Sequence, residues 1–417
     1  MSEPSWYVMP PITSNQTEIP ATTNVEVEKL VYGGEGLARL DGQVVLVPFS
    51  LPGEQVIITP KRVKTGLLRA GKPEIVNASS ERITPRCEYF STCGGCQYQH
   101  SSYEFQLQQK VLILRETLQR LGGINYESEI PVIQGEPWFY RNRIQLHFAN
   151  GRSGFYKAGS HELCDIDHCY ISSPLLVEAI KKLGGAVKSP QWPSFLRSLE
   201  LFTNEEQIQL TILDTTRPVA ARFFEWCATF LPALVPGAIE YKAAGHVFQI
   251  SRGSFFQVNR FLVDALVAEI AGGKTGAHAV DLYAGVGLFS LALAKDFERV
   301  DAVERGGPAC RDLEINADKS GLHVTTARSS AEDFLRELTE APDLMVADPP
   351  RAGLGREATA EILRILPPAL TLVSCDPSTL SRDLKNLLTA YEIERLTLID
   401  LFPHTYHFET VVHLRRK

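Results

Sequence analysis

Apolar and polar residues alternate along residues 24–78, a spacing typical of short β-strands with one buried face. Gly-Gly, Asp-Gly and Pro-Gly pairs interrupt the alternation and indicate turns between the strands. About five short strands of this kind predict a small β-barrel of the oligonucleotide-binding type over residues 23–79. Residues 1–22, rich in Pro, Thr and Ser, are predicted to form a flexible tail.

The pattern of apolar positions changes after the barrel. Residues 101–122 have helical spacing and end in Gly, which predicts a helix. Further on, strand-like runs such as RIQLHFA and QIQLTIL accompany the helical run SPLLVEAIKKLGG, and no cofactor motif interrupts them. We therefore expect a central α+β region over residues 80–255.

From residue 256 onward, strand-like runs alternate with amphipathic helical runs, for example AHAVDLYA followed by LFSLALAKDF. Such alternation predicts a parallel sheet with helices on both faces. The runs ERLTLIDLF and TVVHLRR predict further strands of this sheet. The expected fold class is α/β, with a Rossmann-like domain over residues 256–417.

Composition narrows the class of protein. The chain has 417 residues, 44% hydrophobic and 22% charged, which fits a globular protein of several domains. It contains no run of the roughly 20 apolar residues that a membrane helix needs, and its start does not resemble a secretion signal. We expect a cytoplasmic protein without a membrane partner, whose eight cysteines do not form disulfides.

The net charge of −7 does not favour nucleic-acid binding, but binding depends on a local basic surface. Basic residues gather in two short stretches, Lys61, Arg62, Lys64, Arg69 and Lys72 in the first and Arg141, Arg143, Arg152 and Lys157 in the second. Charge alone leaves open whether these are solvated faces or an RNA surface.

The segment that begins at Asp281 joins a predicted strand to a predicted helix and contains Gly285 and Gly287. These glycines allow a tight turn beside a ligand at the helix N-terminus. The next strand ends in Glu304, about 20 residues on, where a carboxylate can bind ribose hydroxyls. Ser290 replaces the third glycine of the dinucleotide motif, so the pattern favours an S-adenosylmethionine site.

Two residues could perform covalent chemistry. Cys375 ends the predicted strand LTLVSC and precedes a helix, whose N-terminus can lower the pKa of a thiol. Thiolate addition to C6 of uracil places electron density on C5, and a base must later remove the C5 proton. Glu409, just before the last predicted strand, could be that base. A buried structural cysteine and a surface carboxylate are the alternatives.

Five motifs in order, SFFQVN, DLYAGVGLF, VADPPRAG, SCDPSTLSRDL and FPHTYHFE, resemble those of the RNA (uracil-5-)-methyltransferase family. The N-terminal barrel resembles the TRAM domain of that family, and the likeness extends from about residue 24 to the end. The resemblance implies a monomeric enzyme that forms 5-methyluridine. In this enzyme Cys375 would be the nucleophile and Glu409 the base. It also implies a cofactor pocket lined by Gln257, Tyr283, Glu304 and Asp348.

The family often has an asparagine after the third strand, where this chain has Ser330; we assign the adenine contact to Ser330. Amino-group methyltransferases have an aromatic residue after the two prolines, where this chain has Arg351. Cytosine-5 methyltransferases have a second cysteine after the corresponding proline, and this chain has none there. Both departures favour uracil. A non-catalytic RNA-binding relative is the remaining alternative.

Three cysteines, Cys87, Cys93 and Cys96, are spaced closely enough for a metal site. A closed site needs a fourth thiolate, for which Cys164 and Cys169 are candidates. The resemblance favours Cys169 and implies a [4Fe–4S] cluster. Four thiolates would also suit zinc.

Methylation of C5 requires the base to leave its stack and to lie against aromatic side chains. Phe255, beside Gln257, and Arg141, in a run of aromatic and basic residues, are the RNA contacts we expect. The barrel and cysteine segment resemble the branch of the family that modifies large-subunit (23S) ribosomal RNA. Relatives with the same cysteine segment act on transfer RNA, which is the alternative substrate.

Overall fold

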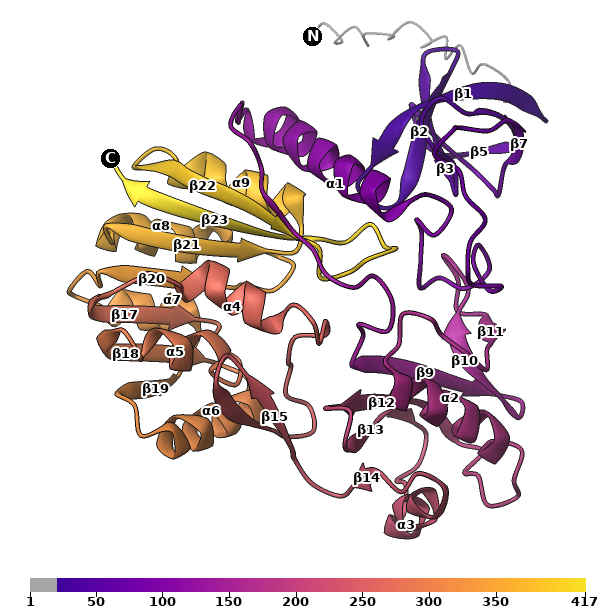
Figure 1. Ribbon diagram of the computed structural model, residues 1–417. Helices are drawn as coiled ribbons and strands as arrows, with labels where there is room; N and C mark the ends of the chain where they lie inside the picture. Colours follow the sequence, from indigo (N-terminus) through magenta and orange to yellow (C-terminus); the bar gives the residue numbers. More distant parts are fainter. Residues whose placement is uncertain (1–20) are drawn as a thin grey trace, which may run out of the picture. The chain divides into compact units, whose positions relative to one another are not determined.

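The computed structural model describes residues 21–417, so the predicted tail lies almost entirely outside the described residues (Figure 1). The chain divides into two compact units. The first holds the chain up to Leu30 together with Glu35–Ser80, and the second holds Val31–Gly34 together with Glu81–Lys417.

The first unit consists of short strands, as the alternating pattern predicted. They form a seven-stranded sheet with the order β5-β6-β3-β2-β1-β4-β7, more strands than the sequence indicated. Alternate valines, such as Val25, Val27, Val45 and Val47, are buried and form its core. The strands are β1 (Thr23–Val31), β2 (Glu35–Leu40), β3 (Gln43–Pro48), β4 (Gln55–Ile58), β5 (Pro60–Lys64), β6 (Leu67–Ala70) and β7 (Glu74–Asn77).

The second unit begins with the cysteine segment and a long helix, α1 (Tyr103–Thr117). Ser102 caps this helix by accepting a hydrogen bond from the Phe105 N–H at 3.2 Å. A π-helical turn, η1 (Leu118–Gly122), extends it to Gly123, whose φ of 68° ends the helix. The predicted helix over residues 101–122 is therefore confirmed.

A six-stranded sheet with the order β11-β10-β9-β12-β13-β14 follows in the chain. The predicted strand RIQLHFA is β9, and the helical run is α2 (Pro174–Ala186). The strands of this sheet are β9 (Arg143–Ala149), β10 (Arg152–Tyr156), β11 (Leu163–Asp165), β12 (Leu196–Thr203), β13 (Ile208–Thr215) and β14 (Leu234–Val235). The same region contains helix α3 (Ala221–Phe230) and a separate hairpin of β15 (Ile239–Ala243) and β16 (His246–Ile250).

The last part of the chain forms an eight-stranded sheet with the order β19-β18-β17-β20-β21-β23-β22-β8. The neighbours from β19 to β21 are parallel, and β23 is antiparallel to both β21 and β22. The strands are β8 (Val132–Ile133), β17 (Gly276–Leu282), β18 (Phe297–Glu304), β19 (Val324–Arg328), β20 (Leu344–Ala347), β21 (Ala369–Ser374), β22 (Tyr391–Ile399) and β23 (Glu409–Arg416).

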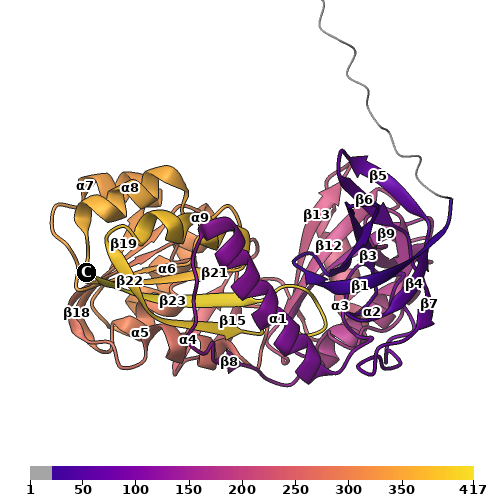
Figure 2. The same ribbon diagram turned by 90° about the horizontal axis from the view of Figure 1, so that it is seen from above.

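Helices cover both faces of this sheet, as the alternation predicted. Figure 2 shows α7, α8 and α9 on one face and α4 and α5 on the other. The helices are α4 (Val263–Ala271), α5 (Leu288–Leu293), α6 (Gly307–Ser320), α7 (Ala331–Glu337), α8 (Gly355–Ile365) and α9 (Pro377–Leu387).

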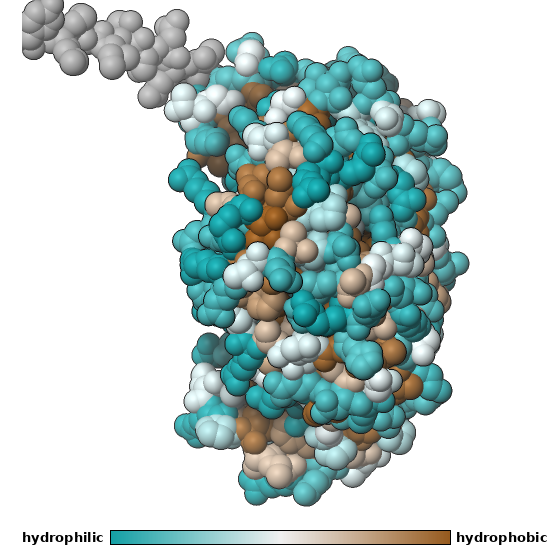
Figure 3. Space-filling model, turned by 90° about the vertical axis from the view of Figure 1, so that its left-hand side faces the viewer, coloured by the Kyte–Doolittle hydropathy of each residue, from teal (hydrophilic) through white to brown (hydrophobic). Residues whose placement is uncertain are grey.

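The surface shown in Figure 3 is mostly hydrophilic with scattered apolar areas. Among the helices of the described residues, none has both the length and the apolar character needed to cross a membrane.

Candidate active site and cysteine cavity

The carboxyl ends of the parallel strands meet at one edge of the eight-stranded sheet, where α/β proteins bind their ligands. Tyr283, Asp348 and Cys375 each follow the end of such a strand, and Glu304 is the last residue of β18. Because β23 runs the other way, its first residue, Glu409, lies at the same edge. The strand order therefore gathers residues that are far apart in the sequence.

Cys375 and Glu409 lie on neighbouring strands. Ser374, the last residue of β21, pairs with Thr410, so Cys375 and Glu409 are the residues next to this pair on either strand. Cys375 is half-buried and Glu409 is buried. The structure thus brings together the predicted nucleophile and the predicted base.

The pKa of the Cys375 thiol is raised to about 11, and not lowered as the helix N-terminus suggested. Burial is the main cause, and the charge of Glu409 adds to it. The N-terminal amides of α9 are occupied, because Asp376 accepts hydrogen bonds from Ser378 N at 2.8 Å and Thr379 N at 3.2 Å. Asp376 also places a negative charge beside the thiol, so the expected effect of the helix is reversed.

The pKa of Glu409 is raised well above its usual value, first by burial and then by the charge of Asp348. Arg351 opposes this, since its guanidinium lowers the pKa of both Glu409 and Cys375. An Arg351 nitrogen also lies 3.3 Å from His407 Nε2. The sequence analysis used Arg351 only to argue against an amino-group methyltransferase and missed its place beside the two catalytic candidates.

Tyr32 is a second residue that the sequence analysis missed. It belongs to Val31–Gly34 of the second unit and donates its hydroxyl to the carbonyl of Cys375 at 2.8 Å. Its ring packs edge-on against Tyr406 and Phe408, with centroids 5.3 and 5.8 Å away. No sequence motif connects this tyrosine with a strand more than 300 residues later.

Two acidic side chains lie beside the glycine turn. Asp281 is fully buried; its Oδ2 accepts a hydrogen bond from Ser290 Oγ at 2.5 Å, and its Oδ1 has no hydrogen-bond partner among the described residues. Burial raises the pKa of Asp281 to about 7 and that of Asp348 to about 7. A positively charged ligand would offset this cost, so these two carboxylates fit a sulfonium cofactor with an amino group.

The glycine turn has the conformation that its residues predicted. Gly285 and Gly287 have φ values of 57° and 93°, and Tyr283 shares this region at 62°. A Cβ on Gly287 would lie 2.8 Å from Leu313 Cδ1. Glu304 Oε2 accepts a hydrogen bond from Gly285 N at 2.9 Å, so the predicted ribose-binding carboxylate also holds the turn.

The remaining cofactor candidates have structural partners of their own. Ser330 caps α7 by accepting a hydrogen bond from Asp333 N at 3.1 Å. Gln257 is buried, and its carbonyl accepts a hydrogen bond from Asn142 Nδ2 at 3.0 Å. Ser330 follows β19 on the ligand-binding side of the sheet, but its hydroxyl is already used within the helix cap.

The two phenylalanines before Gln257 differ in exposure. Phe255 is 60% exposed, whereas Phe256 is 2% exposed and packs among Phe202, Tyr241 and Phe248. Only Phe255 is therefore available to stack on a nucleobase.

The second basic stretch is not a uniform surface. Arg143 is buried, pairs with Glu200 at 2.6 Å and donates to the carbonyl of Ser254 at 3.0 Å. Its guanidinium lies over the ring of Phe202 at 4.3 Å. Arg143 thus stabilises the central region, although it lies on the same face of β9 as exposed Gln145 and Ala149.

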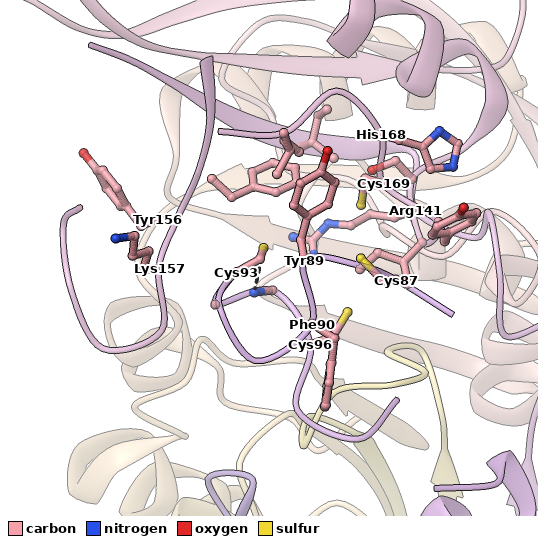
Figure 4. A pocket seen from close by; sticks show the side chains of 18 of the residues that line it. Cys87, Tyr89, Phe90, Cys93, Cys96, Arg141, Tyr156, Lys157, His168 and Cys169 are labelled. Carbon is pink, nitrogen blue, oxygen red and sulfur yellow. Dashed lines mark hydrogen bonds between the residues drawn. The ribbon is translucent and has the colours of Figure 1, made fainter. Parts of the chain in front are cut away.

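Four of the cysteines line one cavity of about 370 Å³ (Figure 4). They are the four predicted ligands, Cys87, Cys93, Cys96 and Cys169, and Arg141 lines the same cavity. Cys164 does not line it; it is buried in the core beneath β9 and β10. The structure therefore favours Cys169 over Cys164 as the fourth member.

Burial raises the pKa values of the Cys87, Cys93 and Cys96 thiols, that of Cys93 to about 12. The charge of Cys169 further raises the pKa of Cys87, Cys93 and Cys96, which shows that the four thiols are close enough to interact. No group of three metal-binding side chains among the described residues converges closely enough to hold a single metal ion. The four thiols of Cys87, Cys93, Cys96 and Cys169 line the walls of the cavity.

Comparisons with known proteins agree over nearly the whole chain. Residues 238–417 match the family model of tRNA (uracil-5-)-methyltransferases, and residues 16–71 match the TRAM domain. An uncharacterised RNA methyltransferase of Aquifex aeolicus is 33% identical over 94% of this chain and 98% of its own length. Another from Bacillus cereus is 31% identical over 97% of this chain and 98% of its own length.

A solved structure resembles this one throughout. The tRNA (uracil-54, C5)-methyltransferase of Pyrococcus abyssi, in complex with S-adenosyl-L-homocysteine, matches with a TM-score of 0.76 and 25% identity. The match covers 94% of this chain and 100% of that protein.

Proposed function

This chain belongs to the RNA (uracil-5-)-methyltransferase family, and from this premise we propose that Cys375 and Glu409 methylate C5 of a uridine in RNA. The observation that carries the proposal is the β21–β23 pairing, which places a thiol and a buried carboxylate side by side. Neither residue has an evident structural role that would require its chemistry.

The reaction follows from these two side chains. The Cys375 thiolate adds to C6 of uracil, and the electron pair of the C5–C6 bond moves to C5. S-adenosylmethionine supplies an electrophilic methyl group, which C5 accepts. Glu409 then removes the C5 proton, the C5–C6 double bond forms again, and the thiolate leaves.

The raised pKa of Glu409 suits this role, because a carboxylate with a raised pKa is a stronger base toward the C5 proton. The cationic guanidinium of Arg351 favours the ionised forms of both Cys375 and Glu409. Arg351 would thus stabilise the Cys375 thiolate and the Glu409 carboxylate, whose charged forms are disfavoured by burial.

We assign the cofactor to the edge occupied by the glycine turn. The buried carboxylates of Asp281 and Asp348 fit its positive charge, and Glu304 fits its ribose hydroxyls. Gln257, Tyr283 and Ser330 complete the proposed pocket.

We also propose that Cys87, Cys93, Cys96 and Cys169 hold a [4Fe–4S] cluster. A zinc site requires four sulfurs about 2.3 Å from one point. The four thiols line one cavity of about 370 Å³, which leaves room for a cluster in which each thiolate binds a different iron. Bound iron would also lower the pKa of thiols that burial now raises.

The substrate that we propose first is large-subunit ribosomal RNA, on the likeness of the cysteine segment to that branch of the family. Transfer RNA is the second candidate, because the Pyrococcus abyssi protein that this structure resembles acts on it. We propose that exposed Phe255 stacks on the flipped base and that Arg141 contacts RNA.

A methyl-transfer assay tests the proposal. The full-length protein is incubated with labelled S-adenosylmethionine and undermodified total RNA, and the labelled nucleosides are identified in each RNA size class. We expect 5-methyluridine in large-subunit ribosomal RNA and none with the Cys375→Ala protein. Label in transfer RNA would select the second candidate, and label in methylcytidine or methyladenosine would refute the assigned chemistry.

A further inference from the structure

The loop of residues 400–408 connects β22 to β23 and ends immediately before Glu409. We call it the anchored loop. It contains no regular helix or strand, so its conformation must be held by contacts with other parts of the chain. Those contacts come from residues that lie outside the methyltransferase sheet.

Four consecutive carbonyls at the start of the loop each accept a hydrogen bond from another part of the chain. The donors are Asn259 Nδ2 to Leu401 at 3.1 Å, Lys110 Nζ to Phe402 at 3.1 Å, the Tyr140 hydroxyl to Pro403 at 3.2 Å, and Gln97 N and Tyr98 N to His404 at 2.9 and 3.0 Å. Except for Asn259, every donor lies between residues 97 and 140, in and around the cysteine segment and α1.

His404 is the most constrained residue of the anchored loop. Its φ of 64° is unfavourable for a residue with a side chain and persists only where its surroundings hold it. Gln106 of α1 accepts a hydrogen bond from His404 N at 3.0 Å, and its Nε2 lies 3.2 Å from His404 Nδ1. The Trp138 ring stacks on the imidazole with centroids 3.9 Å apart.

Helix α1 holds the loop at a second point. Lys110, one turn after Gln106, forms an ion pair of 2.6 Å with Asp400, and both side chains are fully buried. Removing one member of such a pair leaves a buried charge without its partner, so the pair fixes the position of the loop relative to α1.

The cysteine segment is part of the same arrangement. Gln97 and Tyr98, the two amides that hold His404, directly follow Cys96. The carbonyl of Tyr98 accepts a hydrogen bond from Gln106 Nε2 at 3.1 Å, and Gln99 Oε1 accepts one from Cys87 N at 3.1 Å. The backbone around two cavity cysteines is thus hydrogen-bonded to the residues that hold the anchored loop.

We propose that the anchored loop makes the position of Glu409 depend on the state of the cysteine cavity, with Gln106 as a positioning residue between them. The proposal rests on the function proposed above. When Cys87 and Cys96 lose their common ligand, the Gln97 and Tyr98 amides are no longer fixed, and the loop that ends at Glu409 loosens.

Cys375 is placed differently, because it lies between the end of β21 and the capped helix α9, whereas Glu409 directly follows the anchored loop. Thiolate addition and methyl transfer are therefore retained when the loop loosens. Removal of the C5 proton is slowed, and with it the expulsion of the thiolate. The enzyme would accumulate as a covalent complex with methylated RNA.

The experiment follows both halves of the reaction in the same protein. RNA that carries tritium at C5 of uridine reports proton removal, and a denaturant-stable protein–RNA complex reports thiolate addition. Full-length protein is compared without iron, after reconstitution with iron and sulfide, and as the reconstituted variant Gln106→Met. Gln109→Met is the matched control, since Gln109 is a buried glutamine of the same helix that takes no part in the contacts named above.

We expect tritium release to fall by about tenfold in the iron-free protein and in Gln106→Met. A change of this size corresponds to the loss of a buried hydrogen bond. The covalent complex should accumulate in both, and Gln109→Met should match the reconstituted protein. If complex formation and tritium release fall together, the cavity serves folding or RNA binding and the proposal is wrong. The proposal is equally wrong if iron-free protein releases tritium normally.

Failure of the underlying function gives a different result. In that case reconstituted protein with unchanged residues forms neither the covalent complex nor 5-methyluridine. The variant Gln106→Met keeps every cysteine, so it tests the loop even if iron-free protein does not fold.

Discussion

Burial raises the pKa of the Cys375 thiol, and the acidic side chains of Glu409, Asp348 and Asp376 raise it further. Arg351 is the one cation among the causes that shift this pKa, and it acts in the opposite direction. The free protein therefore keeps the Cys375 thiol protonated at neutral pH. The thiol would become reactive when a positively charged molecule, such as the cofactor, binds beside it. In the absence of such a molecule, the thiol would react little with other electrophiles.

The pH dependence of this thiol can be measured directly. Because the thiolate reacts, alkylation of Cys375 by iodoacetamide should still be rising between pH 8 and about 10, toward a pKa of about 11. The Glu409→Gln substitution removes a negative charge, which should move the alkylation profile to lower pH. Mass spectrometry of the peptide that contains Cys375 separates it from the other cysteines. An unchanged profile would show that Glu409 does not influence the thiol.

Single residues also mark where sequence reasoning failed. The motifs pointed to Cys375 and Glu409, but the expected direction of the thiol pKa was wrong, since burial and the charge of Glu409 raise it. Arg143 was grouped with exposed basic residues, although it is buried against Glu200. Both errors have the same cause, because neighbours brought close by the tertiary fold decide how a charged side chain behaves.

At the scale of elements, the order of strands and helices from residue 256 onward was predictable from apolar periodicity. The helix α1 was also predictable, including its end near Gly123. The insertion of β23 between β21 and β22 was not, because strand order depends on long-range pairing that local patterns do not encode. The hydrogen bonds that hold the anchored loop were missed for the same reason.

The glycine turn between β17 and α5 allows a test with two neighbouring positions. Gly285→Ala and Gly287→Ala both place a side chain at positive φ, at a cost of about 1–3 kcal/mol each. A Cβ at position 287 would also approach buried Leu313, whereas the one at 285 has open space. Thermal unfolding should therefore show a larger loss of stability for Gly287→Ala. Equal losses would mean that Leu313 moves aside without cost.

At the scale of the whole molecule, the net charge of −7 conceals a basic stretch within the first unit. Lys61, Arg62 and Lys64 on β5 are exposed, together with Arg69 on β6. A TRAM domain matches this part of the chain, and the family acts on RNA. We expect this stretch to bind phosphates and to add affinity without sequence preference.

A salt titration tests the contribution of β5. Replacing Lys61, Arg62 and Lys64 with Gln should weaken RNA binding and reduce the slope of log affinity against log salt by about one for each phosphate that the variant no longer neutralises. The rate at saturating RNA should not change. Lys181→Gln with Lys188→Gln, both exposed in or just after α2, provides the control. A slope that stays the same in the β5 variant would exclude this surface from RNA binding.

The place of β23 in the sheet also has a consequence for synthesis on the ribosome. Translation makes β21 and β22 first, and the strand that separates them emerges afterwards with Glu409 at its start. Until then two inner strands present unpaired edges, which is the condition under which chains associate wrongly. Slow translation or premature termination before residue 409 would therefore produce a nascent protein that is both inactive and prone to aggregation, so this enzyme should depend on chaperones during its own production.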